Sequence, residues 1–193
     1  MSGPDQVTTL AQVAAEAAKC TRCRLAGTRT NVVFGMGNPD ADLMFVGEGP
    51  GAEEDRQGLP FVGRSGQLLD RLIRQEIGIG RESCYIANVI LCRPPQNRDP
   101  LPDEIEACNP YLEAKLELIE PRVVVTLGNF ATRLLLGTAE GISRLRGRTY
   151  EFRKGHLVPT YHPSAALRGG GEIVAQMRAD LVRAKRLLET RTS

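Results

Sequence analysis

A short apolar segment that ends in a glycine-rich turn places the strongest constraint on how this chain folds. Residues 43–46 form an uninterrupted apolar run of the length expected for a buried strand, and Gly47-Glu48-Gly49-Pro50-Gly51 follows directly. In open α/β sheets, ligands bind at the carboxyl ends of the strands, where this turn would lie. Glycines there let backbone N–H groups approach a ligand closely. Glu48 is the one side chain of the turn suited to acid–base or electrostatic chemistry.

Further apolar segments of strand length alternate with segments whose apolar residues recur at helical spacing. This alternation predicts a parallel sheet with helices on both faces, and therefore an α/β fold with three αβα layers around a central four-stranded parallel sheet. The strands are expected at 43–46, 84–89, 123–127 and 157–161. The helices are expected at 65–77, 102–119, 129–136 and 173–188, with a first helix that is capped by Thr8 or Thr9 and runs to residue 19.

The length and composition indicate an ordinary globular protein. A chain of 193 residues suffices for one domain with a full core, so we expect a single domain over 1–193, with flexible ends at 1–7 and 190–193. No apolar run approaches the roughly 18 residues of a membrane span, and no secretory signal is evident, so we expect a cytoplasmic protein. The net charge is only +2, although residues 144–154 are rich in cations. That segment is either a solvated face or a local stripe for a polyanion.

The cysteines are placed as metal ligands often are. Cys20 and Cys23 form a C-x-x-C pair at the end of the first predicted helix, and Cys92 and Cys108 stand 16 residues apart. Four thiolates from distant segments are what a tetrahedral metal ion or an iron–sulfur cluster requires, although C-x-x-C alone also serves redox and zinc sites. The alternative is that the cysteines are small buried hydrophobes. That interpretation suits Cys84, which opens a predicted strand.

The residues best suited to chemistry follow the ends of predicted strands. Glu48 and Gly49 follow the first strand, Asn88 ends the second, and His162 follows the fourth. Phe61 lies on the loop that leads from the first turn to its helix. The carboxyl ends of parallel strands share one edge of a sheet, so these groups are expected to converge there. An aromatic ring, an amide, an imidazole, a carboxylate and backbone donors together suit a planar, polar, heteroaromatic ligand.

Several motifs occur in a fixed order along the chain. They are Gly47-Glu48-Gly49-Pro50-Gly51-Ala52-Glu53-Glu54-Asp55, Gly58-Leu59-Pro60-Phe61-Val62-Gly63, Asn88-Val89 with Cys92-Arg93-Pro94-Pro95, and His162-Pro163-Ser164. In this order, and with the four cysteines, the chain resembles the family 4 uracil-DNA glycosylases, the iron–sulfur members of their superfamily. The resemblance runs from about residue 20 to residue 168. It implies a central four-stranded parallel sheet and an enzyme that flips deoxyuridine out of DNA. Hydrolysis of the N-glycosidic bond would release uracil and leave an abasic site.

The resemblance implies a role for each matching residue. Phe61 would stack on the uracil ring, and Asn88 would pair with N3–H and O4 on the edge of the base. His162 and backbone N–H groups near Glu48 and Gly49 would stabilise negative charge on the departing uracil, while Glu48 would stabilise the cationic sugar. Pro50 in the turn and Glu54 are the remaining substrate-binding candidates. Glu54 would lie near C5 of the base and exclude the methyl group of thymine.

The sequence departs from its better-known relatives at two points. In their equivalent turn, an aspartate stands where this chain has Gly49. The sequence therefore leaves two alternatives: Glu48 acts as the general base, or the enzyme largely lacks one. Those relatives also insert a leucine into the gap left by the flipped base. Here Leu167 or Arg168 would take that place, and the sequence does not decide between them.

The resemblance also implies a cofactor and a partner. A 4Fe–4S cluster would be held by Cys20, Cys23, Cys92 and Cys108, with zinc as the structural alternative. The partner would be uracil-containing DNA, single- or double-stranded, and the protein is expected to act as a monomer.

Two other functions compete with hydrolysis. One is a uracil-DNA binding protein that traps its substrate covalently, as a related family does through a histidine in a basic insertion. No histidine occurs between Cys92 and Cys108, so the sequence favours hydrolysis over covalent trapping. The other is a non-catalytic iron–sulfur protein that binds DNA or transfers electrons.

Overall fold

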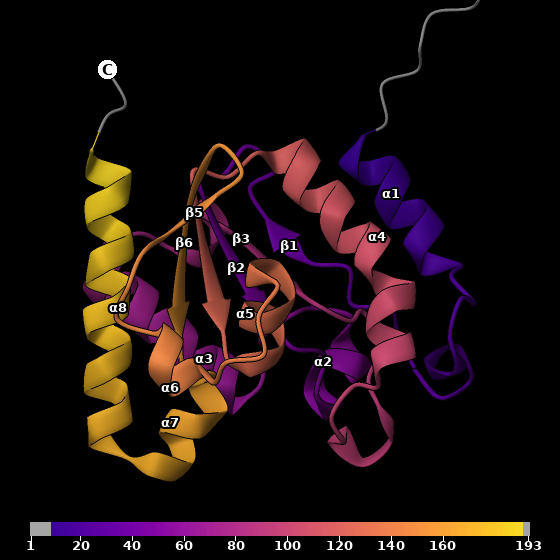
Figure 1. Ribbon diagram of the computed structural model, residues 1–193. Coiled ribbons are helices and arrows are strands. Elements are labelled where there is room, and N and C mark those ends of the chain that lie inside the picture. The colour runs from indigo at the N-terminus through magenta and orange to yellow at the C-terminus, as the bar shows by residue number, and fades with distance from the viewer. Residues whose placement is uncertain (1–8, 191–193) are drawn as a thin grey trace, which may run out of the picture.

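A mixed six-stranded sheet runs through the middle of the computed structural model, which describes residues 9–190 (Figure 1). Its four central strands are parallel and confirm the predicted sheet: β3 (Tyr85–Asn88), β2 (Leu43–Gly47), β4 (Val123–Leu127) and β6 (Gly155–Thr160). Two short edge strands that the sequence analysis missed, β1 (Met36–Gly37) and β5 (Tyr150–Phe152), pair antiparallel with β3 and β6. Segments of two and three residues are too short for a periodic pattern to mark them.

The central strands are apolar because helices cover both of their faces. Every residue of β2, β3 and β4 is buried, as expected for parallel strands inside a three-layer fold. In β2, Phe45 lies opposite Ile86 of β3 and Val125 of β4. This register aligns the carboxyl ends of the strands, so the loops that follow them emerge at one edge, at the bottom of Figure 1.

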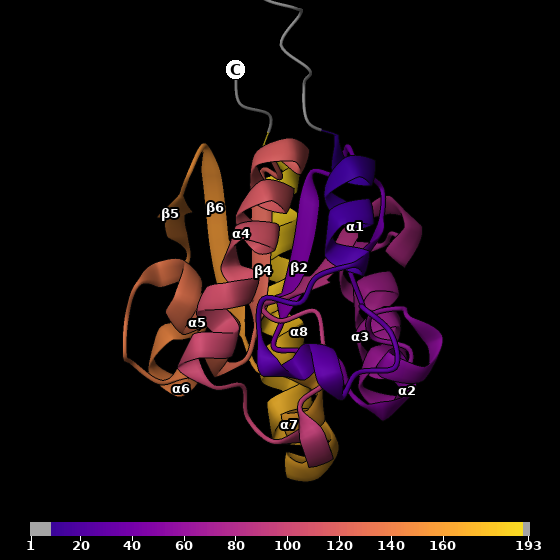
Figure 2. The same ribbon diagram turned by 90° about the vertical axis from the view of Figure 1, so that its right-hand side faces the viewer.

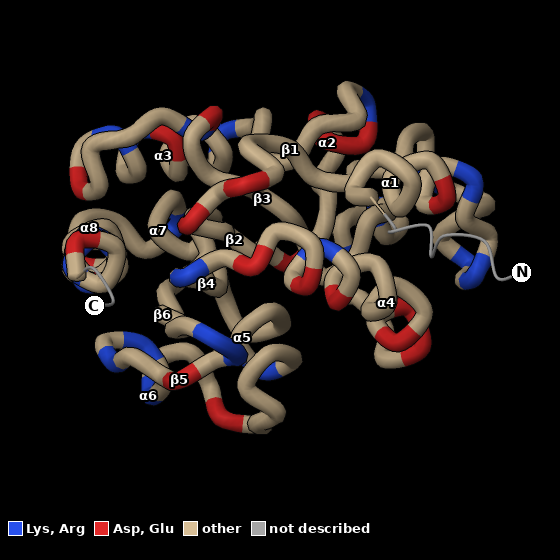
Figure 3. Tube along the Cα trace, turned by 90° about the horizontal axis from the view of Figure 1, so that it is seen from above, with Lys and Arg blue, Asp and Glu red and all other residues tan. Residues whose placement is uncertain are grey.

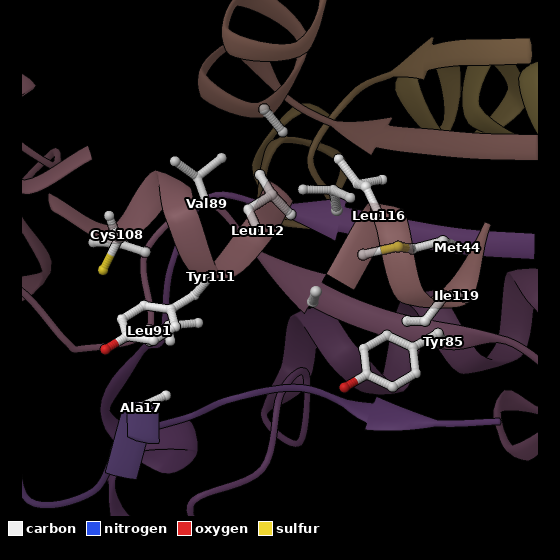
Figure 4. Close-up of a cluster of buried hydrophobic side chains, with 14 of the residues drawn as sticks. Ala17, Met44, Tyr85, Val89, Leu91, Cys108, Tyr111, Leu112, Leu116 and Ile119 are labelled. Atoms are coloured by element: carbon white, nitrogen blue, oxygen red, sulfur yellow. The ribbon is translucent and has the colours of Figure 1, made fainter. Parts of the chain in front are cut away.

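One face of the sheet is covered by α1 (Leu10–Ala18), α4 (Pro102–Ile119) and α5 (Asn129–Leu136), and α1 and α4 stand in front of the sheet in Figure 2. Thr9 caps α1 through a capping box, which decides between the two predicted caps. Figure 4 shows Leu112 and Leu116 of α4 directed toward the strands, close to Met44 and Val89.

The opposite face is covered by α3 (Arg64–Leu72), its π-helical continuation Ile73–Ile77, and α8 (Gly171–Glu189). Leu69 and Leu72 of α3 and Leu181 of α8 are fully buried against strand residues such as Phe45. The predicted helices at 65–77 and 173–188 correspond to these elements.

Short helices missed in the sequence gather at the carboxyl ends of the strands. They are α2 (Ala52–Gln57), α6 (Ile142–Leu145) and α7 (Pro163–Gly169), with 3₁₀ turns at Arg24–Gly27 and Pro95–Asn97. A further missed 3₁₀ turn, Arg81–Ser83, directly precedes β3. Helices of three to seven residues show too few turns for apolar spacing to reveal them. In Figure 1, α2, α6 and α7 all lie at the lower end of the molecule.

The ends predicted to be flexible lie, apart from Thr190, outside the described residues. The carbonyl oxygen of Thr190 accepts a hydrogen bond from Arg122 at 2.8 Å. No helix within residues 9–190 has the length and apolar character needed to cross a membrane.

Three of the five cations in the segment 144–154 form ion pairs with carboxylates from other elements. Arg146 pairs with Asp180, Arg153 pairs with Glu113 of α4, and Lys154 lies 2.7 Å from Glu120. Figure 3 shows basic residues around α6 and β5 and acidic residues along α4. The pairing reduces the free charge of the segment and leaves Arg144 and Arg148 without an ion pair among the described residues.

The Asp180 carboxylate joins α8 to the loops beside β6. It is fully buried and accepts two hydrogen bonds from Arg146, at 2.8 and 2.9 Å. It also accepts from the Gly147 backbone N–H at 3.1 Å and from the Thr160 hydroxyl at 2.8 Å. All of these donors would lose their acceptor if the carboxylate were removed.

Asp180→Ala is expected to lower the free energy of unfolding by about 3–5 kcal/mol, because Arg146 would stay buried without a counter-charge. Urea unfolding followed by circular dichroism measures the change. The control is Asp42→Ala, which removes an exposed pair with Arg122 at 3.7 Å and should cost less than about 1 kcal/mol. Equal losses in the two variants would contradict the assigned role of Asp180.

Candidate active site

A cleft of about 570 Å³ opens at the carboxyl edge of the sheet. The turn after β2, the end of β3, the Pro-rich loop after β3 and the start of α7 all contribute to its walls. A second cavity of about 330 Å³ adjoins it and shares part of its lining. The structure brings together in the cleft every predicted catalytic and substrate-binding residue: Glu48, Gly49, Pro50, Glu54, Phe61, Asn88 and His162.

The end of β2 carries Gly47 because two side chains pack directly on its backbone. A Cβ atom at this position would lie 2.5 Å from Asn88 Oδ1 and 2.6 Å from Phe61 Cζ. Asn88 is 1% exposed, and its Oδ1 has no hydrogen-bond partner among the described residues. A buried amide without partners is costly unless a ligand supplies them, so this amide is suited to read the edge of a bound ring.

Phe61 is held in an unusual backbone conformation by Arg81. Its φ of 52° lies in the left-handed region, which is unfavourable for an aromatic residue. The Arg81 guanidinium donates to the carbonyl oxygens of Pro60 at 2.7 Å and Phe61 at 3.0 Å, and it pairs with Asp70 at 3.1 Å. Sequence reasoning missed Arg81, because nothing in its local pattern indicates a contact twenty residues away.

Glu54 also shapes the Phe61 loop. Its Oε1 accepts from the backbone N–H groups of Val62 and Gly63, both at 3.0 Å. These bonds fix the loop immediately after the aromatic ring. Glu54 therefore lines the cleft and supports its wall, and its expected contact with C5 of a bound base stays a prediction.

His162 is set up as a neutral hydrogen-bond donor. The Ser164 backbone N–H donates to Nδ1 at 3.2 Å, and Ser164 Oγ lies 2.8 Å from the same nitrogen. Because Nδ1 accepts, the neutral ring carries its proton on Nε2. Burial lowers the pKa of His162 to about 4, and the nearby Arg168 acts in the same direction. The imidazole lies 5.7 Å from the Phe61 ring, centroid to centroid.

Glu48 faces a second carboxylate that sequence reasoning did not select. Burial, and after it the negative charge of Asp99, together raise the pKa of Glu48 to about 7. Asp99 comes from the Pro-rich loop and lines both the cleft and the adjoining cavity. Its local sequence resembles an ordinary surface loop, so no signal distinguished it.

Leu167 and Arg168, the two candidates for the wedge, occupy different positions on α7. Leu167 is 42% exposed, which makes it one of three exposed large apolar side chains in residues 9–190. Arg168 instead lines both cavities. The apolar side chain therefore projects outward from the helix that His162 caps, while the cation faces the cleft.

All four predicted ligand cysteines line one small cavity between α1, α4 and the loop after β3: Cys20, Cys23, Cys92 and Cys108. Figure 4 shows Cys108 and Tyr111 on α4, and Ala17 of α1 lines the same cavity. All are free thiols, and Cys84 lies outside this cavity. In the part of the chain that is described, no group of three or more His, Cys, Asp or Glu side chains is arranged to hold a single metal ion.

Burial keeps these thiols protonated until a metal binds them, and one cation lies close by. Burial raises the pKa of Cys92 to about 11, while Arg29 opposes that shift and places Nη1 3.6 Å from its Sγ. Burial also raises the pKa of Cys108. Thiols with such raised pKa values become thiolates when a metal binds them. The donor set and the flanking cation therefore fit a thiolate-bound cofactor.

Comparison with known proteins assigns the chain to a family. A family model described as the uracil DNA glycosylase superfamily matches residues 34–184. The type-4 uracil-DNA glycosylase of Thermotoga maritima is 47% identical over 174 residues, which cover 89% of this chain and 90% of the relative. That of Saccharolobus solfataricus is 46% identical over 163 residues (80% and 76%), whereas the type-5 enzyme of Thermus thermophilus is 33% identical over 180 residues (80% of each). Matches of this extent, with higher identity to the type-4 than to the type-5 proteins, show that the chain belongs to the type-4 uracil-DNA glycosylases.

Proposed function

We propose that this protein is a DNA repair hydrolase that removes uracil from DNA and leaves an abasic site. The observation that carries the proposal is the cleft in which the unpartnered amide of Asn88, the ring of Phe61 and the imidazole of His162 meet. Membership of the type-4 uracil-DNA glycosylases supports the same activity. We further propose that the protein acts as a monomer in the cytoplasm on single- or double-stranded DNA.

The deoxyuridine has to leave the base stack before its glycosidic bond becomes reachable. Phe61 offers its π-face to the extruded base, and its position beside His162 defines one wall of the pocket. Leu167, exposed on α7, is the side chain we assign to the gap in the stack. Arg168 lines the cavity, so we assign it to bind a DNA phosphate or to form part of the cleft wall.

Asn88 selects uracil by the polarity of the base edge. Uracil offers N3–H as a donor and O4 as an acceptor, which one amide matches with its C=O and its NH₂. Cytosine presents the reverse order, so a fixed amide would face groups that it cannot pair with. Each buried unpaired group costs about 1–3 kcal/mol. The packing of Asn88 on Gly47 supplies the fixed orientation that this selection needs.

Departure of uracil places negative charge on the ring, shared between N1 and O2. The neutral imidazole of His162, with its proton on Nε2, is suited to donate to O2. A neutral donor does not protonate the base in the ground state, but it stabilises the anion as it forms. Glu48, in the turn after β2 and in the lining of the cleft, is the carboxylate we assign to stabilise positive charge on the sugar.

The cofactor we propose is a 4Fe–4S cluster held by Cys20, Cys23, Cys92 and Cys108. The cavity that these four thiols line, and the cation of Arg29 beside one of them, support this assignment. When bound, the cluster would supply a rigid cross-link between α1, α4 and the loop after β3, and no step of the hydrolysis requires it. Zinc is the structural alternative.

The activity is tested with a uracil-containing oligonucleotide, alkali treatment and a sizing gel. Hydrolysis gives alkali-labile DNA, whereas a covalent trap gives a protein–DNA band that persists under denaturing conditions. His162→Ala is expected to slow cleavage by about 10²–10³-fold, because one donor to the developing anion is lost. The control is His156→Ala, which changes a histidine outside the cleft. A His162→Ala rate within a few-fold of wild type would remove this residue from the mechanism.

Asn88→Asp is expected to slow uracil excision about tenfold to a hundredfold, because a carboxylate faces O4 in place of an NH₂ donor. The ratio of uracil to cytosine excision, measured on matched oligonucleotides, should fall. Asn38→Asp is the control, since Asn38 lies in an exposed turn where its Oδ1 accepts from Asp40 N–H. An unchanged ratio in Asn88→Asp would refute the assigned reading of the base edge.

Protein purified without oxygen is expected to be brown and to contain about four iron atoms per chain. Cys92→Ser should lose the visible absorbance and the iron, and should also lower the melting temperature, because the cross-link between segments is lost. Cys84→Ala is the control and should keep its iron. Colourless protein that contains zinc would instead establish the structural alternative.

A further inference from the structure

We propose that Asp99 is a further catalytic residue, the general base that takes a proton from the water attacking the sugar. This inference rests on the proposed glycosylase function and extends it. It identifies a residue for the step that the turn after β2 leaves open, where Glu48 is followed by Gly49.

Asp99 lies where the two cavities meet. The described residues that line both cavities include two carboxylates, Glu48 and Asp99, which come from different loops. Asp99 is exposed, and the hydrogen bond it makes within residues 9–190 uses its backbone carbonyl oxygen. Its carboxylate is therefore available to a water molecule in the cleft.

The backbone around Asp99 is held firmly although its side chain is free. Arg98 donates to both oxygens of Glu104, at 2.6 and 2.9 Å, and to the carbonyl oxygen of Asp99 at 2.9 Å. Glu104 is fully buried and also accepts from Leu101 N–H at 2.9 Å. A charge-assisted bidentate pair of this kind fixes both distance and orientation. A general base needs such placement within hydrogen-bond reach of the proton that it removes.

The turn after β2 has no room for a second acid. A Cβ atom on Gly49 would lie 2.6 Å from Cγ1 of Ile90, a fully buried side chain. The aspartate found in the equivalent turn of better-known relatives would therefore displace the core here. A carboxylate supplied by the opposite loop avoids this clash.

The proposed step is balanced without a further reactant. The C1′–N1 bond breaks, and its electron pair leaves with uracil as the anion that His162 stabilises. A water oxygen bonds to the cationic C1′ and passes one proton to the Asp99 carboxylate. Asp99 then releases this proton to solvent, while Glu48 stabilises the sugar cation.

The interaction between Glu48 and Asp99 can be tested through the pH dependence of the excision rate. Glu48 lies near Asp99, whose charge acts with burial to raise the pKa of Glu48 to about 7. Falling pH therefore protonates Glu48 and should reduce activity below about pH 7, whereas His162 stays neutral down to about pH 4. The other charged or titratable groups that line the two cavities are Glu53, Glu54, Arg64, Arg98, Tyr161 and Arg168.

The test compares Asp99→Asn with wild type in single-turnover excision of uracil across pH 5–9. Asp99→Asn is expected to lower the maximal rate by about a hundredfold or more, because the base is lost. Its acid limb should move to lower pH, because a negative charge near Glu48 is gone. Affinity for an oligonucleotide that contains non-cleavable 2′-fluoro-2′-deoxyuridine should be unchanged or tighter. The control is Asp103→Asn, an exposed acid of the same segment that pairs with Arg24 and should keep the wild-type profile.

Rates within twofold of wild type at every pH, or a rate loss matched by lost affinity for the non-cleavable oligonucleotide, would overturn the assignment. A melting temperature equal to that of wild type confirms that Asp99→Asn is folded, and Asp99→Ala provides a second variant if it is not. If wild type itself releases no uracil, the proposed function fails. If wild type is active and Asp99→Asn equally so, this inference alone fails.

Discussion

The site depends on the close approach that Gly47 allows at the end of β2. Asn88 and Phe61 both pack on this backbone, from the neighbouring strand and from the following loop. Any side chain there would push the amide and the ring apart. The pocket is therefore defined by contacts with backbone, which is more rigid than side chains, and selection among bases of similar size depends on that rigidity.

Burial gives the titratable groups of the cleft different tasks. It keeps His162 neutral, which suits this residue to donate a hydrogen bond, and it raises the pKa of Glu48 to about 7, where small changes in nearby charge alter its protonation. The opposite loop adds Asp99, an exposed carboxylate. A neutral donor on the side of the base and two carboxylates elsewhere in the cleft match a reaction that separates an anion from a cation.

The sequence predicts the framework well because burial and periodicity are local signals. The observed bounds of α4 agree with a helix predicted from Pro102 to about residue 119, since Pro102 suits the first turn and acidic residues follow it. The same signals missed α7, β1 and β5, which are too short to show a period. They also missed Arg81 and Asp99, because the importance of both arises from tertiary contacts made by ordinary-looking loop residues.

The Pro-rich loop links the cysteine cavity to the cleft. It starts directly after Cys92, carries Arg98 and Asp99 into the cleft, and returns to α4, which holds Glu104 and Cys108. Both ends of the loop are thus fixed beside the thiols, while its middle faces the candidate substrate. A cofactor bound by the thiols would act on catalysis by restricting this loop, with no chemistry of its own in the reaction. Such an arrangement accounts for a structural cofactor in a hydrolytic enzyme, because the placement of a base to within a fraction of an ångström affects its rate.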